Sequence, residues 1–243
     1  MALSVRHLTA FRGGRVVLED VNFETRREFV LVAGPNGAGK TTLFLAVLNL
    51  APYRGEVCID NICTGDRTKK IGYIPQRLNA DGRGTVWEYV YLPAKFRGIK
   101  RPEHAAAEAL KIVDMYELRN APLAALSGGQ LQRAAIARAL AVGGEVLLLD
   151  EPLANVDPQG RLELIALLRE LKREKTILMT SHELTLPLDL ADKVLILNKR
   201  VVAYGPPADV LREEVLSKVY RYVRVAKTPT GYLCVTEDYA HPH

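Results

Sequence analysis

Several features that would define other classes of protein are missing from this chain of 243 residues. No apolar run approaches the roughly 18–20 residues that a membrane-spanning helix needs. The first residues lack the apolar stretch of a secretory signal peptide, so we expect a cytoplasmic location. Neither an internal repeat nor a low-complexity tract occurs. These absences favour a globular protein with one large domain.

Cysteine is also scarce. Cys58, Cys63 and Cys234 show neither the spacing of metal ligands nor that of a disulfide framework, and we expect them to be small core residues. The net charge of +5 comes from interspersed acidic and basic residues. This pattern is typical of ordinary solubility charge, although it also suits a nucleotide or an anionic membrane surface. We expect no nucleic-acid partner.

The order of the predicted elements is typical of an α/β fold. Around a turn at Gly13-Gly14, short strands are predicted at Leu3–Leu8, Arg15–Leu18 and Val21–Glu24. Strands and helices then alternate, which argues for a mainly parallel sheet with helices on both faces. The later strands are predicted at 29–33, 56–59, 70–74, 145–149, 176–179, 194–197 and 201–204, and helices at 41–50, 157–171 and 183–190.

Residues from Arg77 to about Leu140 have a helical pattern and form the best candidate for a subdomain. Pro102 suits the first turn of a helix there. The tail from Lys227 onward is polar and contains proline, and we expect it to be peripheral and disordered.

A glycine-rich segment between a predicted strand and a predicted helix fits the pattern G-x-x-x-x-G-K-[ST]. Its residues are Gly34, Pro35, Asn36, Gly37, Ala38, Gly39, Lys40 and Thr41, followed by Thr42. In such a loop the backbone N–H groups cradle the β-phosphate of a nucleotide, Lys40 reaches the β- and γ-phosphates, and the Thr41 hydroxyl ligates Mg²⁺. The segment therefore predicts ATP and Mg²⁺ as cofactors.

Polar side chains follow other buried strands. Asp150 ends a hydrophobic strand and is placed to hold Mg²⁺, and Glu151 next to it can act as general base for an attacking water. His182 is a candidate contact of the γ-phosphate, and Gln76 of Mg²⁺ and the water. Lys40 completes the candidate catalytic set.

A second phosphate-binding element precedes an alanine-rich helix. It contains Ser127, Gly128, Gly129 and Gln130, which follow Leu126. Ser127 is a good N-cap, and the glycines let backbone N–H groups approach an anion at the positive end of the helix dipole. By itself this is half of a site.

Taken in order, these motifs resemble the ATP-binding subunit of an ABC transporter. The resemblance covers about residues 1–225 and leaves a tail at 226–243. It implies a P-loop NTPase core with an N-terminal antiparallel β subdomain and a helical subdomain inserted at about 77–140. It also implies that two subunits pack head to tail, so that Ser127 and Gly129 bind the ATP of the partner subunit. The partner is expected to be a second copy of this chain.

The resemblance implies further roles. Phe11 is expected where the family has an aromatic ring that stacks on adenine, with an ordinary apolar hairpin residue as the alternative. Asp157, in the segment Leu153–Asp157, resembles the aspartate that links the two active sites. The aromatic residues Trp87, Tyr89 and Tyr91 either form a groove for a membrane subunit or fill the core of the helical subdomain.

Transport requires a separate transmembrane permease, with this chain peripheral on the cytoplasmic face of the cell membrane, and an importer adds a substrate-binding protein. The segments Ile71–Arg77 and Val201–Pro207 resemble those of zinc, manganese or iron importers. His241 and His243 are assigned to the tail and not to metal sensing. The alternative is a soluble, non-transport ABC ATPase similar to iron–sulfur assembly proteins.

Overall fold

The computed structural model describes residues 2–78, 84–154, 156–181, 188–228 and 231–237, with the backbone alone for 227, 228 and 231–237. Its contacts divide the chain into two compact units. The first comprises Met1–Thr68 and Thr176–His243, and the second Lys69–Lys175. Among the helices of the described residues, none is both long and apolar enough to cross a membrane.

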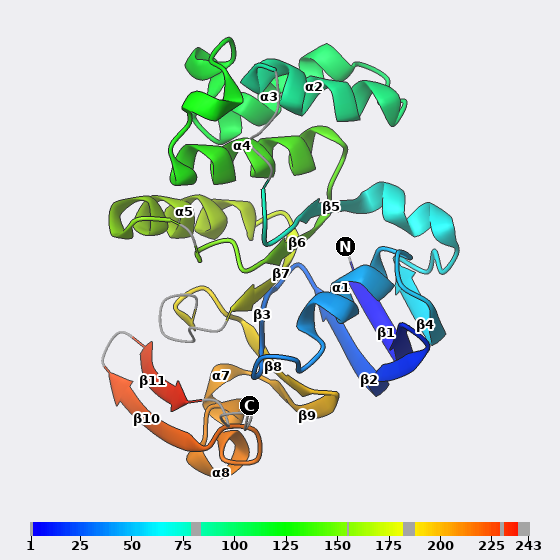
Figure 1. Cartoon of the computed structure of the whole chain (residues 1–243), viewed down its shortest axis with the longest axis vertical. Coiled ribbons are helices and arrows are strands. Elements are labelled where there is room, and N and C mark those ends of the chain that lie inside the picture. Colours follow the sequence, from blue (N-terminus) through cyan, green and yellow to red (C-terminus); the bar gives the residue numbers. More distant parts are fainter. Residues whose placement is uncertain (1, 79–83, 155, 182–187, 229–230, 238–243) are drawn as a thin grey trace. The chain divides into compact units, whose positions relative to one another are not determined.

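A mainly parallel sheet forms the centre of the first unit (Figure 1). Its strands lie in the order β7 (Thr176–Ser181), β3 (Phe29–Ala33), β8 (Lys193–Asn198) and β9 (Arg200–Gly205). Strand β3 runs parallel to both neighbours, and only β9 is antiparallel. All five residues of β3 are buried, as expected for a continuous apolar strand covered on both faces. The predicted α/β class is confirmed.

An antiparallel sheet of three strands also belongs to the first unit. The order is β2 (Arg15–Arg26), β1 (Ala2–Arg12) and β4 (Tyr53–Ile59), and helix α1 (Lys40–Val47) contacts β1 and β2. The sequence predicts two short strands where β2 is one strand of 12 residues, and this prediction is wrong. Irregular register against β1 absorbs the interruption at Asp20, whose φ is +49°, so the pairing continues.

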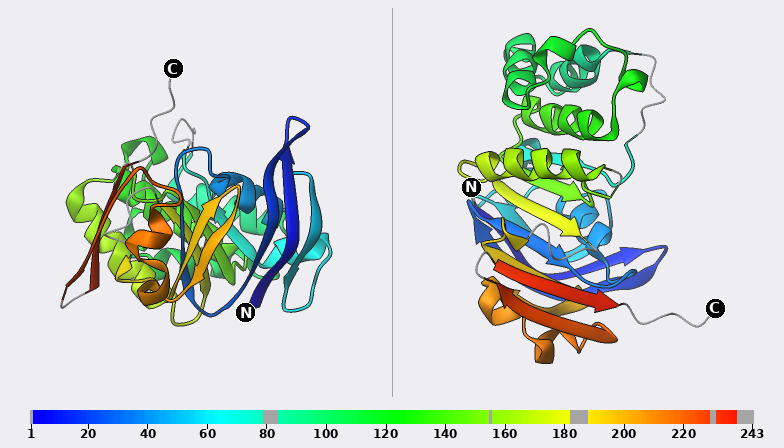
Figure 2. Two further views of the ribbon diagram at one scale, coloured as in Figure 1. Left: turned by 90° about the horizontal axis from the view of Figure 1, so that it is seen from below. Right: turned by 90° about the vertical axis from the view of Figure 1, so that its left-hand side faces the viewer.

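The second unit combines a parallel strand pair, β5 (Ile71–Ile74) and β6 (Val146–Asp150), with a layer of helices. The helices are α2 (Val86–Phe96), α3 (Pro102–Ile112), α4 (Gly128–Ala141) and α5 (Pro158–Leu171), with 3₁₀ turns at Tyr116–Leu118 and Leu123–Ala125. Another 3₁₀ turn, Gly65–Lys70, begins in the first unit. Helix α4 contacts α2 and α3 on one side and α5 on the other (Figures 1 and 2). Its many alanines are buried, which permits this close packing.

Local signals explain where these helices begin. Thr85 and Glu88 form a capping box at the start of α2. Pro102 occupies the first turn of α3, as predicted. Asp157 caps α5, and Pro158 follows at the first helical position. The predicted helix at 183–190 falls mostly outside the described residues.

The C-terminal segment is more ordered than predicted. After the short helices α7 (Pro207–Val210) and α8 (Glu213–Leu216), strands β10 (Tyr222–Thr228) and β11 (Gly231–Glu237) pair as an antiparallel hairpin. The expected start of the tail at residue 226 lies inside β10. Val223 and Val225 pack against a buried cluster that includes Leu216 and Val219, and these apolar contacts anchor the hairpin. His241 and His243 lie outside the described residues.

The expectation for the cysteines is wrong for two of them. Cys58, in β4, and Cys63 form a disulfide, with their Cα atoms 4.1 Å apart. The turn between them has Asp60 and Asn61 at positive φ, which reverses the chain tightly. Cys58 is nevertheless buried, as a core residue would be. Spacing alone does not reveal the pair, because the turn creates their proximity.

Removing this bridge should destabilise the protein. We expect Cys63→Ser to lower the free energy of unfolding by about 2 kcal/mol, the order of magnitude for closing a short loop. Denaturant titration without reductant measures the effect. The same titration with reductant should bring the wild-type midpoint close to that of Cys63→Ser. Equal midpoints for the wild type and Cys63→Ser would contradict the expectation.

Candidate active site

The glycine-rich loop leaves β3 and enters α1, and close packing explains Gly34 and Gly39. A Cβ at Gly34 would lie 2.1 Å from the backbone oxygen of Leu197, in β8. A Cβ at Gly39, whose φ is +99°, would lie 2.4 Å from Cδ2 of Leu18. The backbone of Lys199 also donates a hydrogen bond to the Ala38 carbonyl at 3.0 Å. The loop is therefore held tightly against neighbouring strands.

The start of α1 has the features of an anion site. Its N-cap is Gly39, which supplies no side-chain cap, and the first turn contains no acidic residue. The backbone N–H groups and the positive end of the helix dipole thus favour a negative ligand. Lys40 is only 7% exposed, and its ammonium donates to the carbonyls of Gly34 (2.6 Å) and Pro35 (3.1 Å). Its side chain therefore contacts the backbone of the glycine-rich loop.

A pocket of about 410 Å³ adjoins Phe11, at the end of β1. Its lining residues are Phe11, Gly13, Gly14, Pro52, Tyr53 and Arg54. The Arg54 guanidinium lies 5.6 Å from the centre of the Phe11 ring, within range of a cation–π contact. The sequence interpretation did not single out Arg54. Its place in the pocket depends on the pairing of β4 with β1.

In the second unit, two acidic residues stand at the end of β6. Asp150 is 2% exposed, and Glu151 has an unusual φ of +49°. Strained backbone of this kind is often found where a side chain must be aimed. Burial raises the pKa of Tyr73 to about 12, with a smaller contribution from the negative charge of Asp150. This tyrosine therefore stays neutral beside the acidic strand end.

Gln76 and Glu151 are brought together although 75 positions separate them. The Gln76 side-chain amide donates to Oε2 of Glu151 at 3.0 Å. The parallel pairing of β5 with β6 explains this, because the two strands end side by side. The bond orients the carboxylate that the sequence assigns as general base.

The donor chemistry of the predicted metal ligands fits Mg²⁺. The Thr41 hydroxyl, the Asp150 carboxylate and the Gln76 amide offer only hard oxygen ligands, which this ion prefers. Asp150, which is 2% exposed, supplies the negative charge of this set. No sulfur or imidazole ligand, which would favour a softer metal, is among them.

The second glycine-rich element caps α4. Ser127 accepts a hydrogen bond from the Gln130 backbone N–H at 3.2 Å, and the Gln130 side chain accepts one from the Ser127 N–H at 3.0 Å. The predicted N-cap is thus confirmed. No acidic residue occupies the first turn of α4. A Cβ at Gly129 would lie 3.6 Å from Gly160 Cα, so this end of α4 lies close to the start of α5.

Asp157 serves that second helix as N-cap and accepts a hydrogen bond from the Gly160 N–H at 3.0 Å. Two parts of the predicted site cannot be placed: His182 and Asn155 lie outside the described residues. The remaining predicted residues are distributed between the units. Phe11 and 34–42 lie in the first, and Gln76, 127–130, Asp150, Glu151 and Asp157 in the second.

Comparison with known proteins identifies the family. The ABC transporter family matches residues 18–154. The manganese transport system ATP-binding protein MntB of Halalkalibacterium halodurans is 36% identical over 229 residues, which cover 90% of this chain and 92% of the relative. The zinc import ATP-binding protein ZnuC 1 of Hahella chejuensis is 38% identical over 216 residues, which cover 85% of this chain and 78% of the relative.

A solved structure gives the same result. CbiO1 from Clostridium perfringens, described as part of the ABC transporter complex cbiONQ, superimposes with a TM-score of 0.75 at 28% identity. The match covers 89% of this chain and 92% of the other. The chain belongs to the ABC transporter family. Within it, the chain is an ATP-binding subunit of the type that hydrolyses ATP to power transport.

The packing of the loop makes a direct prediction. Gly34→Ala should weaken ATP binding by about tenfold or more. The added Cβ would displace loop backbone whose N–H groups must face the phosphates, and about 1.4 kcal/mol of strain is enough for a tenfold loss of affinity. Equilibrium titration with a fluorescent ATP analogue measures it. Gly65→Ala is the matched control, since a Cβ there meets nothing within 4 Å. Unchanged affinity in Gly34→Ala would disprove the proposed tight fit.

Proposed function

We propose that this chain hydrolyses Mg-ATP to power the import of a metal ion through a separate permease. The observation that carries the proposal is the identity of 36% with a manganese transport protein and of 38% with a zinc import protein over most of the chain. These relatives support the transport interpretation over an iron–sulfur assembly role. A substrate-binding protein would complete such an importer on the other side of the membrane.

Each part of the site then has a chemical task. The loop 34–41 and the start of α1 bind the phosphates, with Lys40 and Thr42 beside them, and Phe11 stacks on adenine in a pocket of suitable size. Thr41, Asp150 and Gln76 would hold Mg²⁺, which would supply positive charge to the phosphate oxygens. Glu151 accepts a proton from the attacking water, while Gln76 orients its carboxylate. His182 is assigned to the γ-phosphate.

Two copies of the chain are needed to complete each site. The segment 127–130 binds the ATP held by the other copy, and Asp157 joins the two sites. The capping box is compatible with this role, because the Ser127 oxygen accepts from Gln130 while its O–H can still donate to a phosphate oxygen. Because this contact requires the γ-phosphate, ATP closes the dimer and hydrolysis opens it.

The variant Glu151→Gln tests this cycle. It should lower the rate of ATP hydrolysis by about 100-fold or more, the typical contribution of a general base. It should also accumulate as an ATP-bound dimer, since the amide keeps ATP binding and stops the opening step. Phosphate release and size-exclusion chromatography with light scattering measure the two effects.

The matched control is Glu174→Gln, a change to an exposed acid outside the site. It should hydrolyse ATP at the wild-type rate and show no trapped dimer. A Glu151→Gln protein that stays monomeric at saturating Mg-ATP would refute the dimer mechanism.

The helical layer of the second unit offers a surface for the permease. Trp87 and Tyr91 stack with their ring centres 5.7 Å apart on α2, whereas Tyr89 lies 4.6 Å from the Arg138 guanidinium of α4. Burial raises the pKa of Tyr89, as expected for a ring packed between helices. We therefore assign the docking role to the stacked pair Trp87 and Tyr91, and Phe96 on the same helix is 83% exposed.

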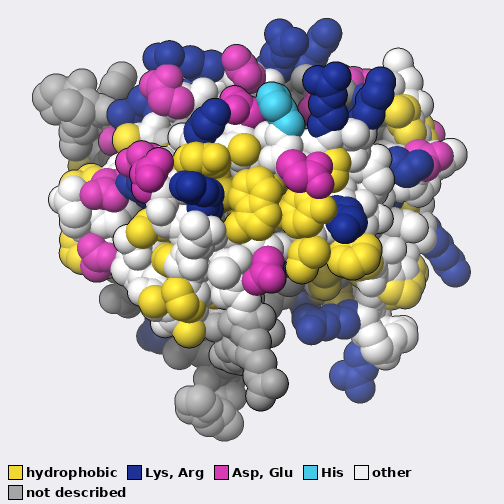
Figure 3. Space-filling model, turned by 90° about the horizontal axis from the view of Figure 1, so that it is seen from above, with side chains coloured by type: hydrophobic (Ala, Val, Ile, Leu, Met, Phe, Trp, Pro, Cys, Tyr) yellow, Lys and Arg dark blue, Asp and Glu magenta, His cyan; other side chains and the backbone are white. Residues whose placement is uncertain are grey.

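Figure 3 views the end of the molecule where α2 and α3 lie and shows hydrophobic side chains gathered there among basic and acidic ones. Exposed apolar groups rimmed by charge are typical of protein–protein contacts. We assign to this surface a short segment of the membrane subunit. The chain would then be peripheral on the cytoplasmic face of the cell membrane.

The pair of changes Trp87→Ala and Phe96→Asp should release the subunit from its permease. Loss of an aromatic anchor costs about 2 kcal/mol or more, roughly a 30-fold loss of affinity. Co-purification with the permease from membranes measures it, and ATP binding should be unchanged. Leu162→Asp, at another exposed apolar position, on α5, is the control and should remain bound. Full retention of the double variant would exclude this surface.

A further inference from the structure

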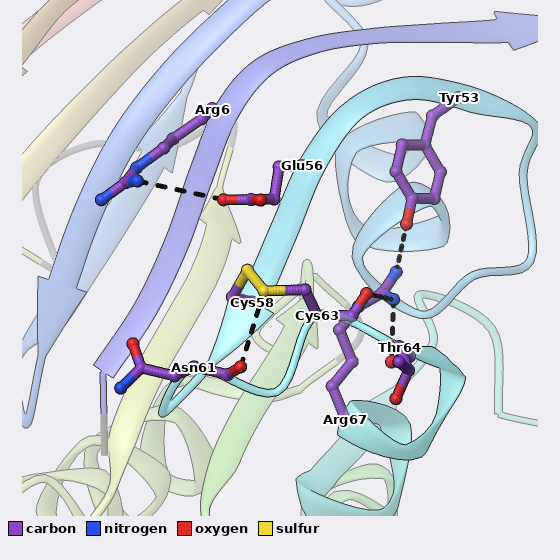
Figure 4. Close-up of a disulfide and its surroundings, with 8 residues drawn as sticks. All are labelled: Arg6, Tyr53, Glu56, Cys58, Asn61, Cys63, Thr64 and Arg67. Atoms are coloured by element: carbon purple, nitrogen blue, oxygen red, sulfur yellow. Dashed lines mark hydrogen bonds and ion pairs between the residues drawn. A yellow bond between two sulfur atoms is a disulfide. The ribbon is translucent and has the colours of Figure 1, made fainter.

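The hairpin that joins Cys58 to Cys63 is built independently of the bond between the sulfurs (Figure 4). Ile59 and Ile62 exchange two backbone hydrogen bonds, at 3.0 and 2.9 Å, directly inside the cysteine pair. The cysteines therefore occupy the next position outward, where side chains of an antiparallel pair approach most closely. The turn alone places both sulfurs on one side of the hairpin.

A third ligand atom lies beside the two sulfurs. The Glu56 carboxylate belongs to β4, two residues before Cys58, so both side chains leave the same face of the strand. The ligand atoms of Glu56, Cys58 and Cys63 all lie within 4.8 Å of one another. Cys58 is buried, whereas Cys63 and Glu56 are exposed, which leaves the cluster open to an ion on one side.

Buried contacts hold the second cysteine in place. Arg67 is only 1% exposed, and its Nη1 donates to the carbonyls of Cys63 (3.3 Å) and Thr64 (3.1 Å). Its Nη2 donates to the Tyr53 hydroxyl at 2.8 Å, which ties this segment back to the start of β4 (Figure 4). The backbone around both sulfurs is therefore fixed by groups other than the disulfide.

We propose that, in the dithiol state, Cys58, Cys63 and Glu56 bind a thiophilic divalent cation of the Zn²⁺ class. Two thiolates and one carboxylate are a known kind of ligand set for Zn²⁺, and water can take the fourth position on the exposed side. Thiolates disfavour Mg²⁺, so the site does not compete for the ion of the nucleotide. The proposal does not depend on the transport role.

The disulfide and the metal site exclude each other, because each uses the same two sulfurs. A dithiol reductant opens the bridge by exchange: its own sulfurs become a disulfide, and the two cysteine sulfurs gain two electrons and two protons. Binding of the cation then displaces both protons. Arg6 Nη1 lies 3.9 Å from Glu56 Oε1, and this oxygen must leave Arg6 to bind the cation.

The test uses the full chain without nucleotide. The protein is reduced with a phosphine, freed of reductant under anaerobic conditions and titrated with Co²⁺ as a spectroscopic probe, then with Zn²⁺ against a chromophoric chelator. We expect one equivalent with thiolate-to-cobalt charge-transfer absorption, displaced by Zn²⁺. The oxidised protein should show no such absorption.

Variants separate the site from adventitious binding. Cys63→Ser should abolish the charge-transfer band. Glu56→Gln should weaken Zn²⁺ binding by about tenfold or more, because even the loss of a residue that only hydrogen-bonds to a metal ligand typically costs this much. Cys234→Ser is the matched control and should bind as the wild type does. Retained binding of the ATP analogue shows that each variant is folded. The proposal fails if the reduced wild type lacks the band, or if Cys63→Ser retains it.

Discussion

The first unit depends on the fixed position of strand β3 and of the glycine-rich loop that follows it. The strand is buried along its whole length between two parallel neighbours, so its backbone cannot shift sideways. The loop then passes so close to the Leu197 carbonyl that any side chain at Gly34 would collide with it. A buried strand and a loop packed closely at Gly34 and Gly39 together fix the start of α1, where we propose that phosphate binds. Binding then requires little rearrangement of the protein.

The helices divide according to the charge at their first turns. Helices α1 and α4 begin with glycine-rich segments and have no acidic residue in the first turn. Helices α2 and α3, which form the scaffold, carry Glu88 and Glu103 there. An acid at a helix start satisfies the dipole internally, whereas its absence leaves the positive potential for a ligand. Among these four helices, the charge pattern matches the proposed anion-binding role of α1 and α4. Helix α5 also lacks an acidic residue in its first turn, but the Asp157 side chain caps it.

Much of the proposed site was predictable because its chemistry is local. The loop 34–41 and the cap at Ser127 are short segments whose residues dictate their own backbone. The order of strands and helices follows likewise from apolar periodicity. The pairing of Gln76 with Glu151, by contrast, joins distant positions, and it exists because β5 and β6 end side by side. The contact of Tyr89 with Arg138 also joins distant positions, and it exists because α4 packs against α2.

Two of the errors show where sequence patterns stop being informative. The cysteines looked unrelated because a four-residue turn with two residues at positive φ, and not their spacing, brings the sulfurs together. The C-terminal segment looked polar, yet two alternating valines suffice to anchor a hairpin on an existing cluster. The sequence by itself determined the family, and its contiguous motifs carry the proposed phosphate-binding chemistry and the proposed role of a second copy. Only the tertiary structure decided which distant side chains meet, because strand pairing and burial set those distances.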